Sequence, residues 1–145
     1  MNIPDAVIAR IVAAIPGGVL ASTDADEVFL ANQVPVYDGI IQKTPPRRYV
    51  VVYVDIGTLR ALAACGANDS ATVRWQTTSV AADGGQVRWI AEKVRDSVDT
   101  KPLADGWSCG PIQHTYSQRP QRDETVAERP AVFQVDQYEV LATRV

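Results

Sequence analysis

The 145-residue chain is poor in the side chains that hold metals and build disulfides. It has two cysteines, Cys65 and Cys109, and a single histidine, His114. A disulfide framework or a zinc site needs more such residues, at spacings that this chain does not have. We therefore expect two reduced thiols and no bound metal.

Long apolar runs and an excess of basic charge are also missing. No stretch approaches the roughly 20 apolar residues of a membrane span, and no basic segment precedes the first apolar residues, so neither a membrane helix nor a secretory signal is expected. The net charge of −3 argues against nucleic-acid binding through bulk charge. With 46% apolar residues and no internal repeat, residues 1–145 fit one domain with a substantial core.

Motifs for catalysis and cofactors are weak. Asp83–Gly85 lacks the Lys-Ser/Thr of a P-loop and the spacing of a dinucleotide fingerprint, which favours a plain helix start. Three loop acids, Asp24, Asp26 and Glu27, lack EF-hand spacing. His114 lies in a strand pattern without a neighbouring group to orient it, which favours a structural role over that of a general base. The sequence predicts no cofactor, no metal and no enzyme.

Two helices are predicted from apolar periodicity. Residues 4–15 place apolar side chains at helical spacing, and Pro16-Gly17-Gly18 ends that run. A second helix begins after Asp83, with Gln86 at the capping-box position, and ends near Asp99. Between the first helix and the first strand, Val28-Phe29-Leu30 is expected to make a short buried contact.

Five strands are predicted, at about 33–41, 48–56, 71–80, 112–117 and 131–144. The apolar phase of the last strand shifts, which suggests a bulge near Asp136-Gln137. Residues 58–70, 102–110 and 117–130 are expected to be loops. Short connections between the first three strands favour antiparallel pairing, and the second helix would supply the crossover. We expect an α+β domain with a mostly antiparallel, mixed sheet of about five strands and two main helices on one face.

The three tryptophans have different expected environments. Trp75 lies in phase with Val73 and is expected in the core. Trp89 lies about 200° around its helix from Val87, outside the apolar stripe, so it either packs in a second layer or contacts another chain. Trp107 lies in a predicted loop and could cover the end of the sheet.

The order of elements and three segments resemble a family of phage proteins. The segments are Tyr37-Asp38-Gly39, the apolar strand 49–54, and residues 129–140, which read RPAVFQVDQYEV. They are similar to the tail terminator proteins of long-tailed bacteriophages, also called tail completion or minor tail proteins, and the likeness covers nearly the whole chain. The resemblance implies a small α+β domain without enzymatic activity. Six copies would form a ring that caps the tail tube, ends its growth and gives the head connector a docking surface.

The resemblance also implies partners and a location. The partners would be further copies of the chain, the major tail tube protein and a head-completion or connector protein, at the tail–neck junction of a virion assembled in the host cytoplasm. DNA would only slide through the channel, which a negative charge suits, and no membrane is involved.

A ring requires two different surfaces on each subunit. Residues 1–42 carry five acids against one arginine, and residues 43–60 carry four bases against one aspartate, so these segments are candidates for the two surfaces. The charge-balanced loop 117–130 could order itself against a neighbouring ring. The predicted interface residues are Asp24, Asp26, Glu27, Lys43, Arg47, Arg48, Trp89, Arg119, Arg122, Asp123, Glu124 and Arg129.

Two other functions remain open from the sequence. One is a different neck component, such as a head-closure or head–tail connector protein. The other is a small enzyme or ligand-binding domain with a site near Trp107, His114 and Tyr116, which would require a deep pocket with convergent polar groups.

Overall fold

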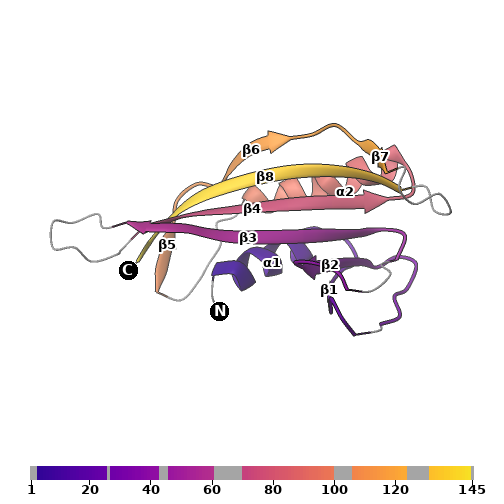
Figure 1. The fold of residues 1–145 in the computed structure, drawn as a ribbon, viewed down its shortest axis with the longest axis horizontal. Coiled ribbons are helices and arrows are strands. Elements are labelled where there is room, and N and C mark those ends of the chain that lie inside the picture. Colours follow the sequence, from indigo (N-terminus) through magenta and orange to yellow (C-terminus); the bar gives the residue numbers. More distant parts are fainter. Residues whose placement is uncertain are drawn as a thin grey trace.

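The described chain is an α+β fold in which two helices lie on a mixed sheet (Figure 1). The computed structural model describes residues 3–25, 27–42, 46–60, 70–99, 106–123 and 131–144, with the side chains of 56–60, 99 and 144 left out of the account. The helices are α1 (Ile3–Ala14), α2 (Gly84–Asp96) and the short 3-10 helix η1 (Ser97–Asp99). The strands are β1 (Gly18–Ala21), β2 (Val34–Asp38), β3 (Tyr49–Arg60), β4 (Ser70–Ala81), β5 (Trp107–Cys109), β6 (Gln113–Ser117), β7 (Gln121–Asp123) and β8 (Ala131–Arg144).

The sheet has the order β1-β2-β3-β4-β8, with β5, β6 and β7 paired to the outer edge of β8. The α+β class is confirmed, but the predicted count of about five strands is too small. The three additional strands, β1, β5 and β7, have only three or four residues each. Such short segments show no periodicity of their own and become strands only through the neighbours that they pair with.

The predicted antiparallel pairing of the first strands is wrong for β2 and β3, which run parallel, as do β1 and β2. Residues 39–48 connect β2 to β3, starting from Gly39 at a φ of 87°. A five-residue strand needs only a short return path, so this connector suffices. The remaining pairs are antiparallel. Because β4 and β6 both run antiparallel to β8, they are parallel to each other, and α2 is the crossover between them as expected.

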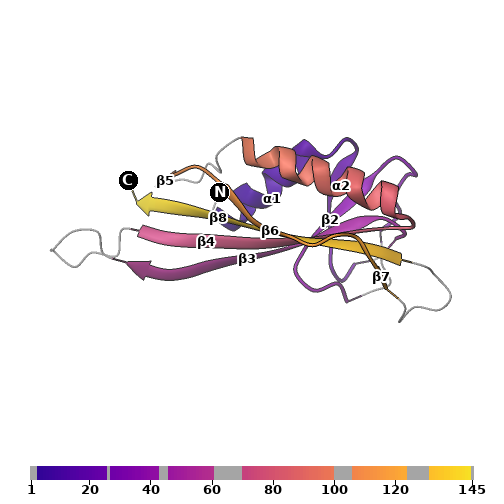
Figure 2. The ribbon, with the colours of Figure 1, turned by 90° about the horizontal axis from the view of Figure 1, so that it is seen from above.

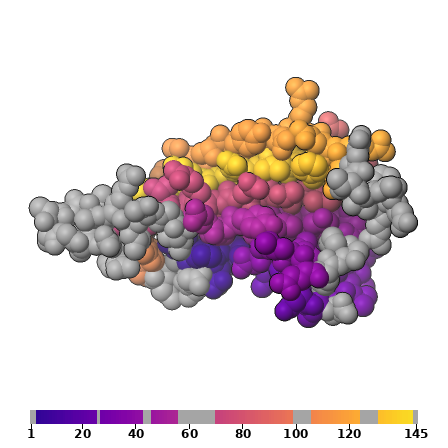
Figure 3. Space-filling model, viewed as in Figure 1, coloured from indigo at the N-terminus to yellow at the C-terminus, as the bar shows by residue number. Residues whose placement is uncertain are grey.

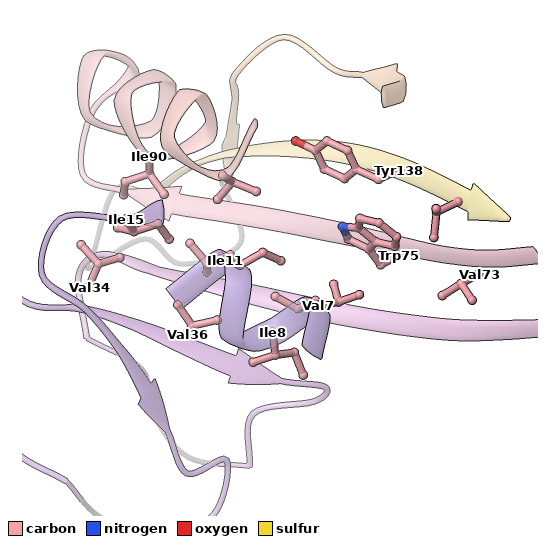
Figure 4. Packing of buried hydrophobic residues seen from close by; sticks show 14 of the residues in the cluster. Val7, Ile8, Ile11, Ile15, Val34, Val36, Val73, Trp75, Ile90 and Tyr138 are labelled. Atoms are coloured by element: carbon pink, nitrogen blue, oxygen red, sulfur yellow. The ribbon is translucent and has the colours of Figure 1, made fainter. Parts of the chain in front are cut away.

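Both helices cover the same face of the sheet (Figure 2). The helix α1 buries Ile3, Ala6, Val7, Ile8 and Ile11, and α2 buries Val87, Ile90, Ala91 and Val94. The N-cap prediction is confirmed, because the Asp83 carboxylate accepts from the Gln86 backbone N–H at 2.8 Å. Figure 4 shows Val7, Ile8, Ile11 and Ile90 packed with Trp75 and Tyr138 between helices and strands.

The bulge predicted in the last strand is wrong. The register of β8 with β4 is unbroken from Thr143 opposite Ser70 to Val132 opposite Ala81. The apolar phase shifts because two polar residues, Gln134 and Asp136, occupy the covered face. The register irregularity lies instead in the facing strand β6, between His114 and Tyr116.

The strand β3 is longer than predicted and continues to Arg60, with a register shift between Ile56 and Leu59. The loop predicted over residues 58–70 therefore begins later, and residues 61–69, including Cys65, lie outside the described residues. Cys109 is buried in β5.

Candidate interaction surfaces and a buried polar cluster

A polar cluster lies on the covered face where α2, β6 and β8 meet. Its centre is Asp136, whose side chain is fully buried. Asp136 Oδ1 lies 2.9 Å from His114 Nε2 and 3.5 Å from an Arg95 guanidinium nitrogen, and the Gln134 amide donates to Oδ2 at 3.4 Å. The Ser117 hydroxyl lies 3.5 Å from both Arg95 and Gln134. The cluster therefore ties one helix and two strands together.

Tertiary pairing assembles this cluster from distant parts of the chain. Ser117 is opposite Asp136 and His114 is opposite Tyr138 in the β6–β8 register, while the last turn of α2 brings Arg95. His114 thus has an orienting partner that its sequence neighbours did not reveal. With its side chain 24% exposed and held against a buried carboxylate, His114 fixes β6 to β8.

Aromatic rings adjoin the cluster. Tyr138 stacks on Trp75 with centroids 5.7 Å apart, and the His114 imidazole lies 4.9 Å from the Tyr138 ring. Burial, and then the negative Asp136, raise the pKa of the Tyr138 phenol above its usual value, while Arg95 and Thr77 oppose that shift. Trp75 is 3% exposed, which confirms its expected place in the core.

The acidic and basic segments contact each other within one chain. The Gly39 backbone N–H donates to the Val52 carbonyl at 2.9 Å, and the Arg48 guanidinium donates to the Ala31 carbonyl. The two segments are therefore neighbours in the folded chain.

The charged candidates in these segments have local roles. Asp24 is exposed and accepts from the Ser22 hydroxyl at 2.9 Å, and Glu27 accepts from the Ser22 backbone N–H. Arg47 is exposed, whereas Arg48 is half-buried. The predicted interface residues Asp26 and Lys43 lie outside the described residues.

Four large aliphatic side chains project from β1 and from the segments that follow β1 and β2. Leu20 is 62% exposed, Val28 98%, Leu30 67% and Ile40 72%. The expected buried contact of Val28-Phe29-Leu30 is therefore wrong for Val28 and Leu30. Sequence reasoning missed this surface because apolar residues are assigned to the core by default. We call Leu20, Val28, Leu30 and Ile40 the apolar end.

The remaining predicted interface residues lie elsewhere. Trp89 is 38% exposed on α2, and the Lys93 ammonium lies 5.9 Å from its ring centroid. Arg119 and Arg122 are exposed, with Arg122 in β7, a strand within the segment predicted to be a loop. Asp123 is the last residue of β7. Burial raises the pKa of the Tyr49 phenol, and the negative Asp123 raises it further. Glu124 and Arg129 lie outside the described residues.

The face of the sheet opposite the helices carries the long strands β3, β4 and β8 at the molecular surface (Figure 3). Its central row is Asp55–Arg74–Glu139, with an ion pair of 2.9 Å between Arg74 and Glu139. We call this the open face. Trp107, which the sequence placed in a loop, lies in β5 and packs against the core.

Comparison with known proteins does not identify a family for this chain. No family model and no curated protein matches the chain. One solved chain is 22% identical over 73% of this chain and 78% of its own length, with a TM-score of 0.42, which is too low to support an argument. In the described part of the chain, no helix is long and apolar enough to cross a membrane.

Proposed function

We propose that this protein is a structural subunit that forms a ring on the head-proximal end of a phage tail tube. The ring would end tail polymerisation and provide the surface to which the head connector docks. The particular family rests on the three sequence segments that resemble tail terminator proteins. The proposal that the chain is an assembly subunit rests on the exposed aliphatic side chains of the apolar end.

The apolar end carries this proposal. Four large aliphatic side chains, all more than half exposed, project from β1 and the two segments that follow β1 and β2. Single apolar residues are common on protein surfaces, but four large ones exposed within residues 20–40 favour binding to another macromolecule. An assembly subunit buries such a group on a neighbour.

The test is assembly followed by tail capping. We expect the purified protein, alone or on tail tubes, to form rings of about six subunits in electron micrographs, and its loss to give tails of unregulated length. A double variant, Val28→Ser with Ile40→Ser, should remain folded but bind its neighbour with a dissociation constant at least roughly tenfold higher. The reason is that two aliphatic side chains are no longer buried in the interface. The matched control, Val28→Ile with Ile40→Val, keeps the surface apolar and should assemble normally.

A strictly monomeric protein that never associates with tail tubes contradicts the proposal. Another neck component, a head-closure or connector protein, is separated by partner capture, since a terminator binds the tail tube and the other components bind the portal side. A ligand-binding or enzymatic role near His114 predicts loss of a measurable activity in His114→Ala.

A further inference from the structure

The strand edges of the sheet differ in how well they are protected against pairing with another chain. Folded proteins protect edges by keeping them short or by placing charges or proline on them. The strand β1 has four residues, β5 has three, and β7 has three that include Arg122 and Asp123. These edges are therefore poor templates for a new strand.

The distal half of β3, Tyr53–Arg60, carries the charged Asp55 and Arg60, but it is a longer free edge than any of these. The pairing of β2 with β3 ends where Asp38 faces Val52, and the next hydrogen bond runs from the Gly39 N–H to the Val52 carbonyl at 2.9 Å. From Tyr53 to Arg60, no described strand pairs with β3 on that side (Figure 1). Because backbone groups alternate along a strand, those of Val54 point to the same edge as those of Val52.

The strand β6 has the second free edge. It pairs with β8 alone among the described strands, and all five of its residues, Gln113–Ser117, are exposed. Its one titratable side chain other than Tyr116 is His114, which turns inward to Asp136. That contact and the hydrogen bond from the Thr115 hydroxyl to the Gln137 carbonyl hold β6 in place, with its outer edge free.

We propose that β6 of one copy of this chain adds to the distal half of β3 in the next copy, so that the sheets of neighbouring subunits become continuous. The five residues of β6 span about 17 Å, which fits within the eight-residue segment Tyr53–Arg60. The junction would bring together two exposed tyrosines, Tyr53 and Tyr116, which are 43% and 49% exposed.

The partner is a second copy because one chain supplies both halves of the junction, at opposite edges of one sheet. Joining them repeats the same contact from subunit to subunit, which is the head-to-tail geometry of a ring. This inference rests on the proposed self-assembly and names its contact.

Proline at position 54 tests the β3 edge. The Val54 N–H points away from β4, so Val54→Pro leaves the β3–β4 ladder intact and removes one donor from the junction. The control, Val54→Thr, changes the same partly buried side chain but keeps the N–H. We expect Val54→Pro to raise the dissociation constant between subunits roughly tenfold or more above that of Val54→Thr, because a carbonyl is left unpaired. Equal dissociation constants would overturn the inference.

Cysteine cross-linking tests both edges without relying on that variant. Tyr116 lies opposite Gln137 and therefore on the open face, as do Tyr53 and Asp55. In a chain with Cys65→Ala and Cys109→Ala, we would combine Tyr116→Cys with either Tyr53→Cys or Asp55→Cys, to cover two registers. Oxidised assemblies should give a ladder of dimer, trimer and higher species up to the closed ring. Each single variant should stop at the dimer.

The outcomes separate this inference from the proposed function. If the protein caps tails but neither cysteine pair gives a cross-linked ladder, the β3–β6 junction is wrong and the tail-capping function is unaffected. A ladder from a protein that does not cap tails supports the junction and removes the function.

Discussion

The covered face and the open face of β4 and β8 are built from alternating residues of the same two strands, yet they have different chemistry. On the covered face, Trp75 stacks on Tyr138 and a buried carboxylate binds His114 and Arg95. On the open face, Arg74 pairs with Glu139, with their side chains 63% and 37% exposed. One strand pair thus presents a packed core to its own helices and a solvated surface to its surroundings.

The comparison shows where stability and assembly can be changed separately. Substitutions on the covered face remove packing that no solvent replaces, whereas those on the open face exchange one hydrated group for another. The difference between the two faces is therefore best tested by making the same kind of substitution on each face and comparing the effects.

The largest expected difference is between Trp75→Ala and Gln76→Ala, which are adjacent in β4. Removing the buried indole should lower the free energy of unfolding by about 3–5 kcal/mol. Removing the Gln76 amide on the open face should change it by no more than about 0.5 kcal/mol. Urea denaturation followed by circular dichroism measures both. Similar losses for the two variants would mean that the faces are not distinct.

The two ion pairs of β8 give the next largest difference. Asp136→Ala leaves His114 and Arg95 facing a buried gap. Because these partners are 24% and 45% exposed, the expected loss is about 2–3 kcal/mol. Glu139→Ala breaks an exposed pair and should cost less than about 1 kcal/mol. Hydrogen exchange should also show β6 opening in Asp136→Ala and remaining protected in Glu139→Ala.

Loosening the helix that covers the inner face should have a smaller effect. Asp83→Ala removes the N-cap of α2 and should cost about 1 kcal/mol. Asp96→Ala, near the other end of α2, removes only a 4.0 Å contact with Lys93 and serves as the control, with an expected change within about 0.5 kcal/mol. Thermal denaturation distinguishes the two, and equal melting temperatures would contradict a capping role for Asp83.

At neutral pH, Tyr138→Phe is expected to have the smallest effect on the free energy of unfolding. Its effect should appear at alkaline pH. Below the usual phenol pKa of 10.0, both the folded and the unfolded chain keep the proton, and stability is unaffected. Above that pH the unfolded chain releases a proton that the folded chain retains, because the folded pKa is raised, so stability falls as the pH rises. Tyr138→Phe should make this fall shallower and leave the part due to Tyr37 and Tyr49, whose pKa values burial also raises. An unchanged alkaline slope would contradict this.

Much of the fold could be predicted because its longer elements have regular patterns. The periodicity of α1, the Asp83 cap of α2 and the strand β4 were all identified from local sequence. The parallel pairing of β2 with β3 was missed because a ten-residue connector permits either direction. The phase of β8 was misread because Gln134 and Asp136 are polar residues on the covered face, where pattern reasoning expects apolar ones.

The surfaces were predicted less well. The place of Trp89 outside the apolar stripe followed from its angle on the helix. The apolar end did not, since nothing in Val28, Leu30 or Ile40 distinguishes an exposed aliphatic residue from a core one. The polar cluster joins Arg95, His114 and Asp136, which lie on three separate elements, and no local spacing reveals such a set.

The sequence by itself determined the helices, the longer strands and the α+β class, because helical and strand periods are local properties of the chain. Only the tertiary structure decided strand direction, the partner of His114 and the edges left unpaired along β3 and β6. These depend on which distant segments become neighbours, and that choice is made by packing of the whole sheet against its helices.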